Sequence, residues 1–316
     1  MLKVVIIGTG GHSLDHHGHA CAMLGDSIDR AAVCSLDPEQ AAKYAEETGF
    51  HQVYTDYEIM IDEIKPDAII AVLPVPFVYP VAAKLIPKRI PLLMEKPPGE
   101  NSAQTEELLA MAEKYDTTVM VSFNRRFSTA LQRMKNFFVH QELSDPLLLR
   151  ATMFRTNRLE PEFIMATAIH ALDAIIYLLG EPVTVDVKVL PEMTNALIAN
   201  MTFQNGCTGI FTLLPDTGII KETYEISGQG YQLSADTVDC TYHAWIKKEL
   251  VDSYHPTPDA TAAEISGGAT ETAYFLHQIE NGKRPKPGLR HGLAVMRLAE
   301  TLQKAMDDAH RQYQPS

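Results

Sequence analysis

The sequence is poor in cysteine, in long apolar runs and in positive charge, and each shortage excludes a class of protein. Its four cysteines form no CxxC pair, which argues against a disulfide framework or a thiolate zinc site and favours a reducing cytoplasm. No apolar run approaches the ~20 residues that a membrane-spanning helix needs. Lysine and arginine number 27 against 40 aspartates and glutamates, and the resulting net charge of −13 argues against nucleic-acid or anionic-membrane partners.

What the chain does have is length and an alternating rhythm in its first part. Its 316 residues, 46% of them hydrophobic, suffice for two domains. Short, nearly continuous apolar runs alternate with helical patterns, which is typical of parallel strands covered on both faces. The predicted strands are Lys3–Ile7, Ala31–Ser35, Ala68–Leu73, Pro91–Met94 and Thr118–Phe123, and the predicted helices are Glu39–Thr48, Tyr57–Glu63, Val78–Leu85 and Ser102–Lys114. The pattern predicts a doubly wound α/β domain of the Rossmann type over residues 1–122.

After residue 122 the rhythm changes to several strands in succession. The predicted strands there are Leu147–Phe154, Val183–Leu190, Ala196–Phe203, Cys207–Leu214, Tyr224–Ser227 and Tyr231–Leu233, and the predicted helices are Thr129–His140, Phe163–Leu179, Thr270–Asn281 and Gly292–Asp308. Asn205-Gly206 between two strands is a strong hairpin signal. Residues 123–316 are therefore predicted to form an α+β domain, a largely antiparallel sheet with helices on one face, with a surface loop at Asp252–Gly268.

A glycine turn follows the first predicted strand and opens a helix, which is the context of a dinucleotide-binding turn. In Gly8-Thr9-Gly10-Gly11-His12-Ser13, Gly8 permits the tight turn and Gly10 lets the backbone approach a pyrophosphate that faces the helix N-terminus. Ser13 stands where the motif has its third glycine, and it is small enough for close helix–strand packing. The turn predicts dinucleotide binding, and the alternative is a purely structural glycine turn.

Histidines crowd the residues after this turn. His12, Asp15, His16 and His19 lie at spacings of three and four, so that some of them could share a helix face and bind a metal. That spacing arises easily by chance among four histidines in eight residues, and the phosphates should lie there. We therefore predict solvent-facing or phosphate-facing histidines and no metal site.

The tip of the second predicted strand bears on the choice between NAD and NADP. An acidic residue at such a tip accepts hydrogen bonds from the ribose hydroxyls of NAD. Here the tip is Ser35, and Asp37 follows two residues later in a turn. Ser35 can accommodate a 2′-phosphate, although no arginine follows to bind it. The expected cofactor is NAD or NADP, with NADP slightly favoured.

Two further motifs lie at predicted strand ends, Glu95-Lys96-Pro97 after the fourth strand and Asn124-Arg125-Arg126-Phe127 after the fifth. Leu73-Pro74 follows the third strand, and His170-Ala171-Leu172-Asp173 lies on a predicted helix. Together with the glycine turn, these motifs make the chain resemble the Gfo/Idh/MocA family over essentially its whole length. That family is the glucose–fructose oxidoreductase and inositol dehydrogenase group of NAD(P)-dependent enzymes.

The resemblance implies a Rossmann domain followed by an open-sheet domain that covers the nicotinamide and supplies the substrate pocket. It implies that Lys96 contacts the substrate hydroxyl or carbonyl, that His170 acts as the acid/base, and that the Lys96–Pro97 bond is cis. The candidate catalytic residues are thus Lys96 and His170. The candidate cofactor-binding residues are Gly8, Gly10, Gly11, His12, Ser13, Ser35, Leu73, Pro74, Glu95 and Lys96, and the candidate substrate-binding residues are Lys96, Arg125, Arg155, His170 and Asp173.

These residue types suit hydride transfer, which needs a proton carrier beside the reacting oxygen. A positively charged nicotinamide ring disfavours the charged form of a nearby lysine, and histidine titrates near neutrality. Lys96 and His170 could therefore exchange the alcohol proton. The alternatives are a solvated strand end for Lys96 and a satisfied core group for His170.

The chain departs from the family pattern at one position. Many members carry an aspartate four residues before the helix histidine, and here that position is Ala166. Asp173, three residues after His170, is either a partial substitute or an anchor of the helix. Arg125 and Arg155 suit a polar or anionic substrate, and the alternative for one of the two arginines after the fifth strand, Arg125 or Arg126, is a salt bridge at the domain hinge.

The sequence therefore predicts an NAD(P)-dependent oxidoreductase that acts on a sugar, a cyclitol or a related polyol. The alternative is a catalytically weak, dinucleotide-binding sensor on the same fold, which the loss at Ala166 makes concrete. We expect a small polar or anionic substrate, no nucleic-acid or membrane partner, and a homodimer or homotetramer formed through the C-terminal sheet. The expected location is the cytoplasm.

Overall fold

The computed structural model describes residues 1–313, and the chain divides into two compact units. The first comprises Met1–Phe123 and Gly268–Leu293, and the second comprises Asn124–Gly267 and the segment from Ala294 onward. The sequence had indicated one division between residues 122 and 123. The structure adds a late segment to the first unit, where its helix α10 (Gly268–Glu280) carries two fully buried polar residues, Glu271 and Thr272.

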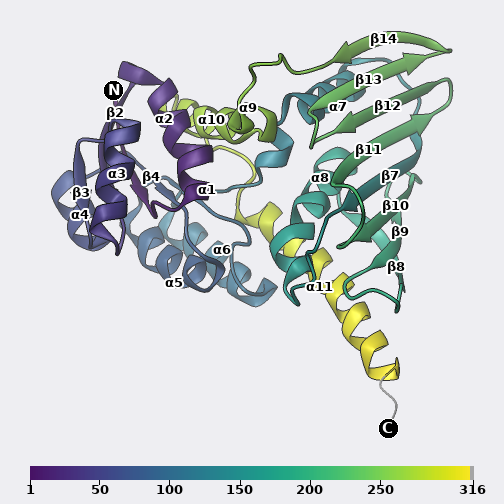
Figure 1. Cartoon of the computed structure of the whole chain (residues 1–316), viewed down its shortest axis with the longest axis horizontal. Helices are drawn as coiled ribbons and strands as arrows, with labels where there is room; N and C mark the ends of the chain where they lie inside the picture. Colours follow the sequence, from purple (N-terminus) through teal and green to yellow (C-terminus); the bar gives the residue numbers. More distant parts are fainter. Residues whose placement is uncertain (314–316) are drawn as a thin grey trace. The chain divides into compact units, whose positions relative to one another are not determined.

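The first unit is built on a six-stranded parallel sheet with the order β3-β2-β1-β4-β5-β6 (Figure 1). The strands are β1 (Leu2–Ile7), β2 (Ile28–Cys34), β3 (Gln52–Tyr54), β4 (Ala68–Ala71), β5 (Leu92–Met94) and β6 (Val119–Val121). The helices are α1 (Gly11–Ser13), a π-helix η1 (Leu14–Gly18), α2 (His19–Met23), α3 (Pro38–Thr48), α4 (Tyr57–Ile64), α5 (Val75–Leu85) and α6 (Ser102–Tyr115). Every strand pair is parallel, and the order reverses between β1 and β4. The predicted Rossmann-type sheet is confirmed, and ligands of such sheets bind at this reversal.

Helix starts in this unit follow from short polar side chains that cap free amides. The Asp37 carboxylate accepts hydrogen bonds from the amides of Glu39 and Gln40 at the start of α3, and Asn101 accepts one from Gln104 at the start of α6. The strands β1, β2, β4, β5 and β6 consist mainly of apolar residues that are buried on both faces of the sheet. In β1, Val4, Val5 and Ile6 have no exposed surface. This core fixes the carboxyl ends of the strands at one edge.

The second unit is built on an eight-stranded sheet with the order β14-β13-β12-β11-β7-β10-β9-β8 (Figure 1). The strands are β7 (Pro146–Phe154), β8 (Pro182–Val189), β9 (Leu197–Phe203), β10 (Thr208–Leu214), β11 (Lys221–Gly228), β12 (Tyr231–Asp236), β13 (Thr241–Ile246) and β14 (Glu249–Tyr254). All neighbouring pairs are antiparallel except β10 with β7. Alternate residues are buried, as in Leu197, Ala199 and Met201 of β9, because helices cover one face. The predicted α+β fold is confirmed.

The helices of the second unit are α7 (Thr129–His140), a π-helix η5 (Ile164–Ala168) that runs into α8 (Ile169–Leu179), the short α9 (Ala262–Ser266) and most of α11 (Leu289–Tyr313). The predicted surface loop at Asp252–Gly268 was wrong at both ends, because β14 extends to Tyr254 and α9 lies within it. No helix among residues 1–313 is long and apolar enough to cross a membrane.

Candidate active site

The glycine turn after β1 has the backbone that a dinucleotide turn requires. Gly8 has φ +95°, and a Cβ there would lie 2.0 Å from the carbonyl oxygen of Val72, so only glycine fits. At Gly10 and Gly11 an added Cβ would meet no protein atom within 4 Å. The backbone is thus open on the side where a pyrophosphate would approach, and the residues of this turn fit a dinucleotide.

Ser13 lies in the slot of the missing third glycine and faces the protein interior. Its hydroxyl lies 3.0 Å from the Tyr44 hydroxyl of α3, and the Tyr44 hydroxyl also donates to the Ser13 carbonyl oxygen at 3.2 Å. Gly18 packs closely on the same ring, since a Cβ there would lie 2.6 Å from the Tyr44 oxygen. The Ser13 side chain therefore joins two helices, which leaves only its backbone amide to face a phosphate.

At the tip of β2, polar side chains are engaged in local turns. The Ser35 hydroxyl accepts a hydrogen bond from the amide of Asp37 at 3.3 Å, while the Asp37 carboxylate caps α3. An Asp37 carboxylate held in a cap has less capacity to accept from ribose hydroxyls. This geometry leaves Ser35 as the polar side chain nearest the strand end.

The carboxyl ends of β4 and β5 add Leu73, Pro74, Glu95 and Lys96 to the same edge of the sheet. Glu95 is 5% exposed; its amide donates to Ala71 and its Oε2 accepts from the amide of Lys96 at 3.1 Å. Burial raises the pKa of the Glu95 carboxyl, but the hydrogen bond from His12 and the nearby imidazole of His17 outweigh it, so that the pKa lies well below its usual value. The Lys96–Pro97 peptide bond is cis.

The histidines after the glycine turn have separate partners. His12 Nε2 lies 3.0 Å from Glu95 Oε1, and the His12 ring lies 4.3 Å from the His16 ring. His19 pairs with Glu47 on the surface at 3.0 Å. The structure thus brings His12 to the EKP glutamate, a contact that the spacing of the motif did not reveal.

We expect metal analysis of the purified protein to find no stoichiometric zinc or iron. The reason is that His12 and His19 are directed to different carboxylates, Glu95 and Glu47, instead of converging on one point. Inductively coupled plasma mass spectrometry after dialysis tests this. Zinc or iron at one equivalent per chain, lost in a His12→Ala, His16→Ala variant, would contradict it.

His17 is the residue that the sequence interpretation missed. It is 1% exposed, its Nδ1 lies 2.9 Å from the Thr272 hydroxyl, and its Nε2 lies 3.9 Å from Glu95 Oε1. His17 was missed because of the local backbone geometry. Residues 14–18 form a π-helix, whose wider turn changes which side chains share a face.

In the second unit, His170 lies in the first turn of α8, directly after the π-helix η5. Ala166 is half-buried within that π-helix, and Thr167 beside it accepts a hydrogen bond from Arg158 at 2.7 Å. Arg158 also pairs with Glu160. In an α-helix of 3.6 residues per turn, residues 166 and 170 would stack on one face, and the wider turn of the π-helix at Ile164–Ala168 alters their relative orientation.

The remaining substrate-binding candidates of this unit make buried ion pairs. Asp173 has no exposed surface and accepts from the Arg126 guanidinium through both oxygens, one at 3.1 Å. Arg155 donates to the carboxylate of Glu222.

Glu222 is itself fully buried among cations. Arg125 Nε lies 3.4 Å from its Oε1, and the Tyr224 hydroxyl donates to it at 3.0 Å. Burial raises the pKa of the Glu222 carboxyl, but Arg125 and Arg155 outweigh it and keep the pKa below its ordinary value. Asp173 and Glu222 are therefore charged anchors for arginines that follow β6 and β7.

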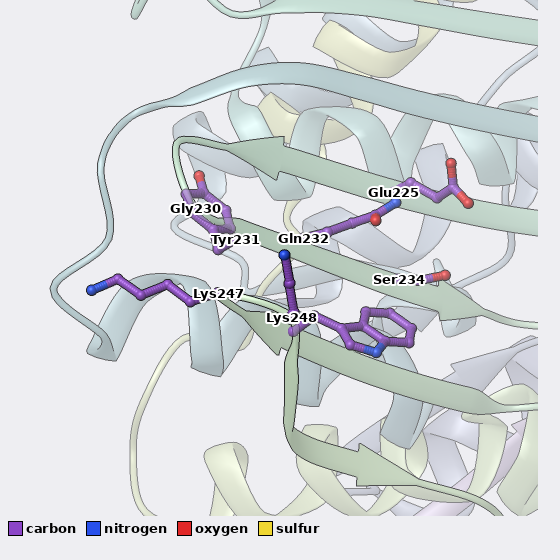
Figure 2. A pocket seen from close by; sticks show the side chains of 8 residues that line it. Glu225, Gly230, Tyr231, Gln232, Ser234, Lys247 and Lys248 are labelled. Atoms are coloured by element: carbon purple, nitrogen blue, oxygen red, sulfur yellow. The ribbon is translucent and has the colours of Figure 1, made fainter.

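A hollow on the second sheet contains none of the predicted site residues. It is lined by Glu225, Gly230, Tyr231, Gln232, Ser234, Trp245, Lys247 and Lys248, and Figure 2 shows the Glu225, Gln232 and Lys248 side chains around it. The candidate residues of the first unit lie instead at the carboxyl ends of β1, β4 and β5.

Comparison with known proteins adds to this geometry. Residues 2–123 match the oxidoreductase family with an NAD-binding Rossmann fold. This match, together with relatives named as glucoside and inositol dehydrogenases, supports the Gfo/Idh/MocA family for this chain.

The proteins to which the chain is similar include dehydrogenases of a glucoside and of inositol. The chain is 27% identical to D-glucoside 3-dehydrogenase of Escherichia coli (strain K12) over 57% of its own length and 55% of the relative, so the match spans about half of that protein. It is 27% identical to inositol 2-dehydrogenase 4 of Saccharopolyspora erythraea, over 75% and 71% of the two chains. An oxidoreductase from Agrobacterium radiobacter, solved with NAD+, L-tartaric acid and magnesium, is 17% identical with a TM-score of 0.83 over 98% and 97% of the chains, which shows a shared fold.

Proposed function

We propose that this protein is an NAD(P)-dependent oxidoreductase that transfers a hydride between nicotinamide and a hydroxyl-bearing carbon of a sugar, cyclitol or related polyol. The observation that carries the proposal is the edge of the first sheet. The glycine turn, whose backbone at Gly10 is open to a ligand, lies at this edge. Lys96, which follows β5, lies at the same edge. The sugar and cyclitol dehydrogenases among its relatives support the substrate class.

The roles of the residues follow from what each can do to a proton. When bound, the dinucleotide accepts the hydride from the alcohol carbon or returns it. Lys96 and His170 are proposed to take the proton that leaves the alcohol oxygen as the carbonyl forms, and to return it in reverse. Glu95 holds the amide of Lys96, and Gly8, Gly10, Gly11, Ser35, Leu73 and Pro74 are proposed to line the dinucleotide, with His12 and Ser13 beside its phosphates.

The arginines and Asp173 of the second unit fit a supporting part in substrate binding. Arg125 retains partial exposure, 23% of its side chain, and is proposed to contact a polar or anionic group of the substrate. Arg155 and Asp173 are proposed to shape that pocket through the Glu222 and Arg126 pairs that they form.

Ser35 supports a preference for NADP over NAD. No acidic side chain remains free at the β2 tip, because the Asp37 carboxylate caps α3. A serine there accommodates a 2′-phosphate without charge repulsion. Titration of the protein with each dinucleotide measures the preference, and tighter binding of NAD than of NADP would contradict it.

Ala166 predicts a substrate with few hydroxyl contacts beside His170. An aspartate at position 166 would offer a charged acceptor that alanine lacks, so we expect wild type to act poorly on inositol and glucose. Ala166→Asp is expected to raise kcat/KM on these substrates. Wild-type values of roughly 10⁴ M⁻¹s⁻¹ or above on either would show that the alanine is no handicap.

We propose that the chain assembles as a homodimer or homotetramer through the face of the second sheet that its helices do not cover. Ile198, Ile210, Leu214 and Trp245 lie on this face, half-buried. An Ile210→Glu variant is expected to sediment as a monomer, whereas Val139→Glu on an exposed position of α7 should not change assembly. A wild-type monomer at micromolar concentration would contradict this.

The four cysteines are buried free thiols, which supports the proposed cytoplasmic location.

A second function, that of a dinucleotide sensor with little turnover, is favoured by Ala166 alone. A panel of cyclitols, aldoses, glycosides and sugar acids, assayed with NAD and NADP at the nicotinamide absorbance band, separates the two. An oxidoreductase reduces cofactor with at least one member of the panel. A sensor binds the dinucleotide but does not reduce it with any member of the panel.

A further inference from the structure

A row of buried polar side chains joins α10 to the EKP motif within the first unit, through one hydrogen bond and one ion-pair contact. It runs from Thr272 through His17 to Glu95, whose other oxygen accepts from the amide of Lys96. Thr272 has no exposed surface, His17 is 1% exposed and Glu95 is 5% exposed. More than 250 residues of sequence separate the two ends that meet at His17 and Thr272.

The donors along this row are fixed by the Thr272 hydroxyl, which has a single hydrogen. Its oxygen lies 3.0 Å from the carbonyl oxygen of Gly268 and 3.4 Å from that of His16, and both of these can only accept. The hydroxyl therefore donates to a carbonyl and accepts from His17, so that Nδ1 of His17 carries a hydrogen. The ring is thereby fixed at Nδ1, and its Nε2 faces Glu95 Oε1 at 3.9 Å, an ion-pair distance that is too long for a hydrogen bond.

Glu95 has an oxygen for each side of this arrangement. Oε1 accepts a hydrogen bond from His12 Nε2 at 3.0 Å and lies 3.9 Å from His17 Nε2. Oε2 accepts a hydrogen bond from the Lys96 amide at 3.1 Å. A buried carboxylate held from several directions has little freedom to rotate, because each lost hydrogen bond would leave a buried charge unsatisfied. The Glu95 carboxylate is therefore held between the Lys96 amide and the imidazoles of His12 and His17.

We propose that His17 is a positioning residue, which links Thr272 to Glu95 and thereby holds the backbone from which Lys96 projects. The inference rests on the proposed function insofar as Lys96 serves as the proton carrier. It adds that α10, far away in the sequence, takes part in setting the geometry of that lysine.

The first test is amide hydrogen exchange at Lys96, measured by NMR in the full chain without any substrate. His17→Asn and Thr272→Val are expected to lower the protection of the Lys96 amide by at least about tenfold. The matched control is His19→Asn, a surface histidine paired with Glu47, which should leave the protection unchanged. Unchanged protection in Thr272→Val, which keeps the side-chain shape and removes the acceptor, would overturn the inference.

The second test separates positioning from a general loss of structure. In both variants kcat on the best panel substrate is expected to fall by about 10- to 100-fold, and the dinucleotide Kd should stay within about twofold. The His17→Asn, Thr272→Val double variant should lose no more than the worse single variant, because both interrupt the same row of contacts. Additive losses would contradict it. A wild type without turnover would refute the proposed function, and the exchange result would still decide the role of His17.

Discussion

Replacing Lys96 by methionine is expected to lower turnover by about 10²- to 10⁴-fold and to leave dinucleotide affinity within about threefold of wild type. Methionine keeps much of the length and apolar character of the side chain but cannot carry a proton. The glycine turn that would hold the pyrophosphate is untouched by this change, because it follows β1, whereas Lys96 follows β5. The loss should therefore appear in kcat.

Steady-state kinetics and fluorescence titration with the dinucleotide measure the two quantities separately. The control is Lys84→Met, which removes a surface lysine paired with Glu58 in the same unit and should change neither quantity. A Lys96→Met protein with wild-type kcat and weakened dinucleotide binding would make Lys96 a binding residue. Wild-type values of both would place it at a solvated strand end.

Replacement by alanine is expected to lower the stability of the protein at Gly8 and its affinity for the dinucleotide at Gly10. Gly8→Ala should cost about 3 kcal/mol or more of unfolding free energy, because its φ of +95° disfavours a side chain and the new Cβ would meet the Val72 carbonyl oxygen. Gly10→Ala should leave stability nearly unchanged, since φ is −70° and a Cβ there meets no protein atom within 4 Å. Gly10→Ala should instead weaken dinucleotide binding by at least about tenfold, because that open space is where the pyrophosphate approaches.

Denaturant unfolding and dinucleotide titration of both variants decide between a ligand-binding turn and a structural one. Each variant serves as the control for the other, as the substitution is identical and the two sites lie two residues apart. Gly10→Ala protein that binds NAD and NADP as tightly as wild type would favour the structural turn.

Most of the fold could be predicted because its strands are apolar runs with clear ends. The five predicted strands of the first sheet match β1, β2, β4, β5 and β6, and Asn205-Gly206 does connect β9 to β10. The strand β3 was missed because it has only three residues, and none of them is buried. The hairpin of β13 and β14 was missed because its turn consists of Lys247 and Lys248, both with positive φ, where glycine or asparagine is usual.

The site could be predicted only as far as regular periodicity extends. The EKP motif and the glycine turn are local patterns, and the structure places both at the same edge of the first sheet. His17 lies in a π-helix and its partner Thr272 is far away in sequence, so no local pattern could connect them. The same holds for Asp173, since its pairing with Arg126 depends on how α8 packs within the second unit.

The central claim is hydride transfer, and deuterium transfer from substrate to nicotinamide tests it most directly. The best substrate of the panel, deuterated at the carbon that is oxidised, is incubated with the protein and its preferred dinucleotide, and the reduced cofactor is isolated. We predict deuterium at the nicotinamide C4 position, with transfer lowered in Lys96→Met by the same factor as kcat. Dinucleotide that binds tightly and gains no deuterium with any substrate of the panel would contradict the account and make the protein a sensor.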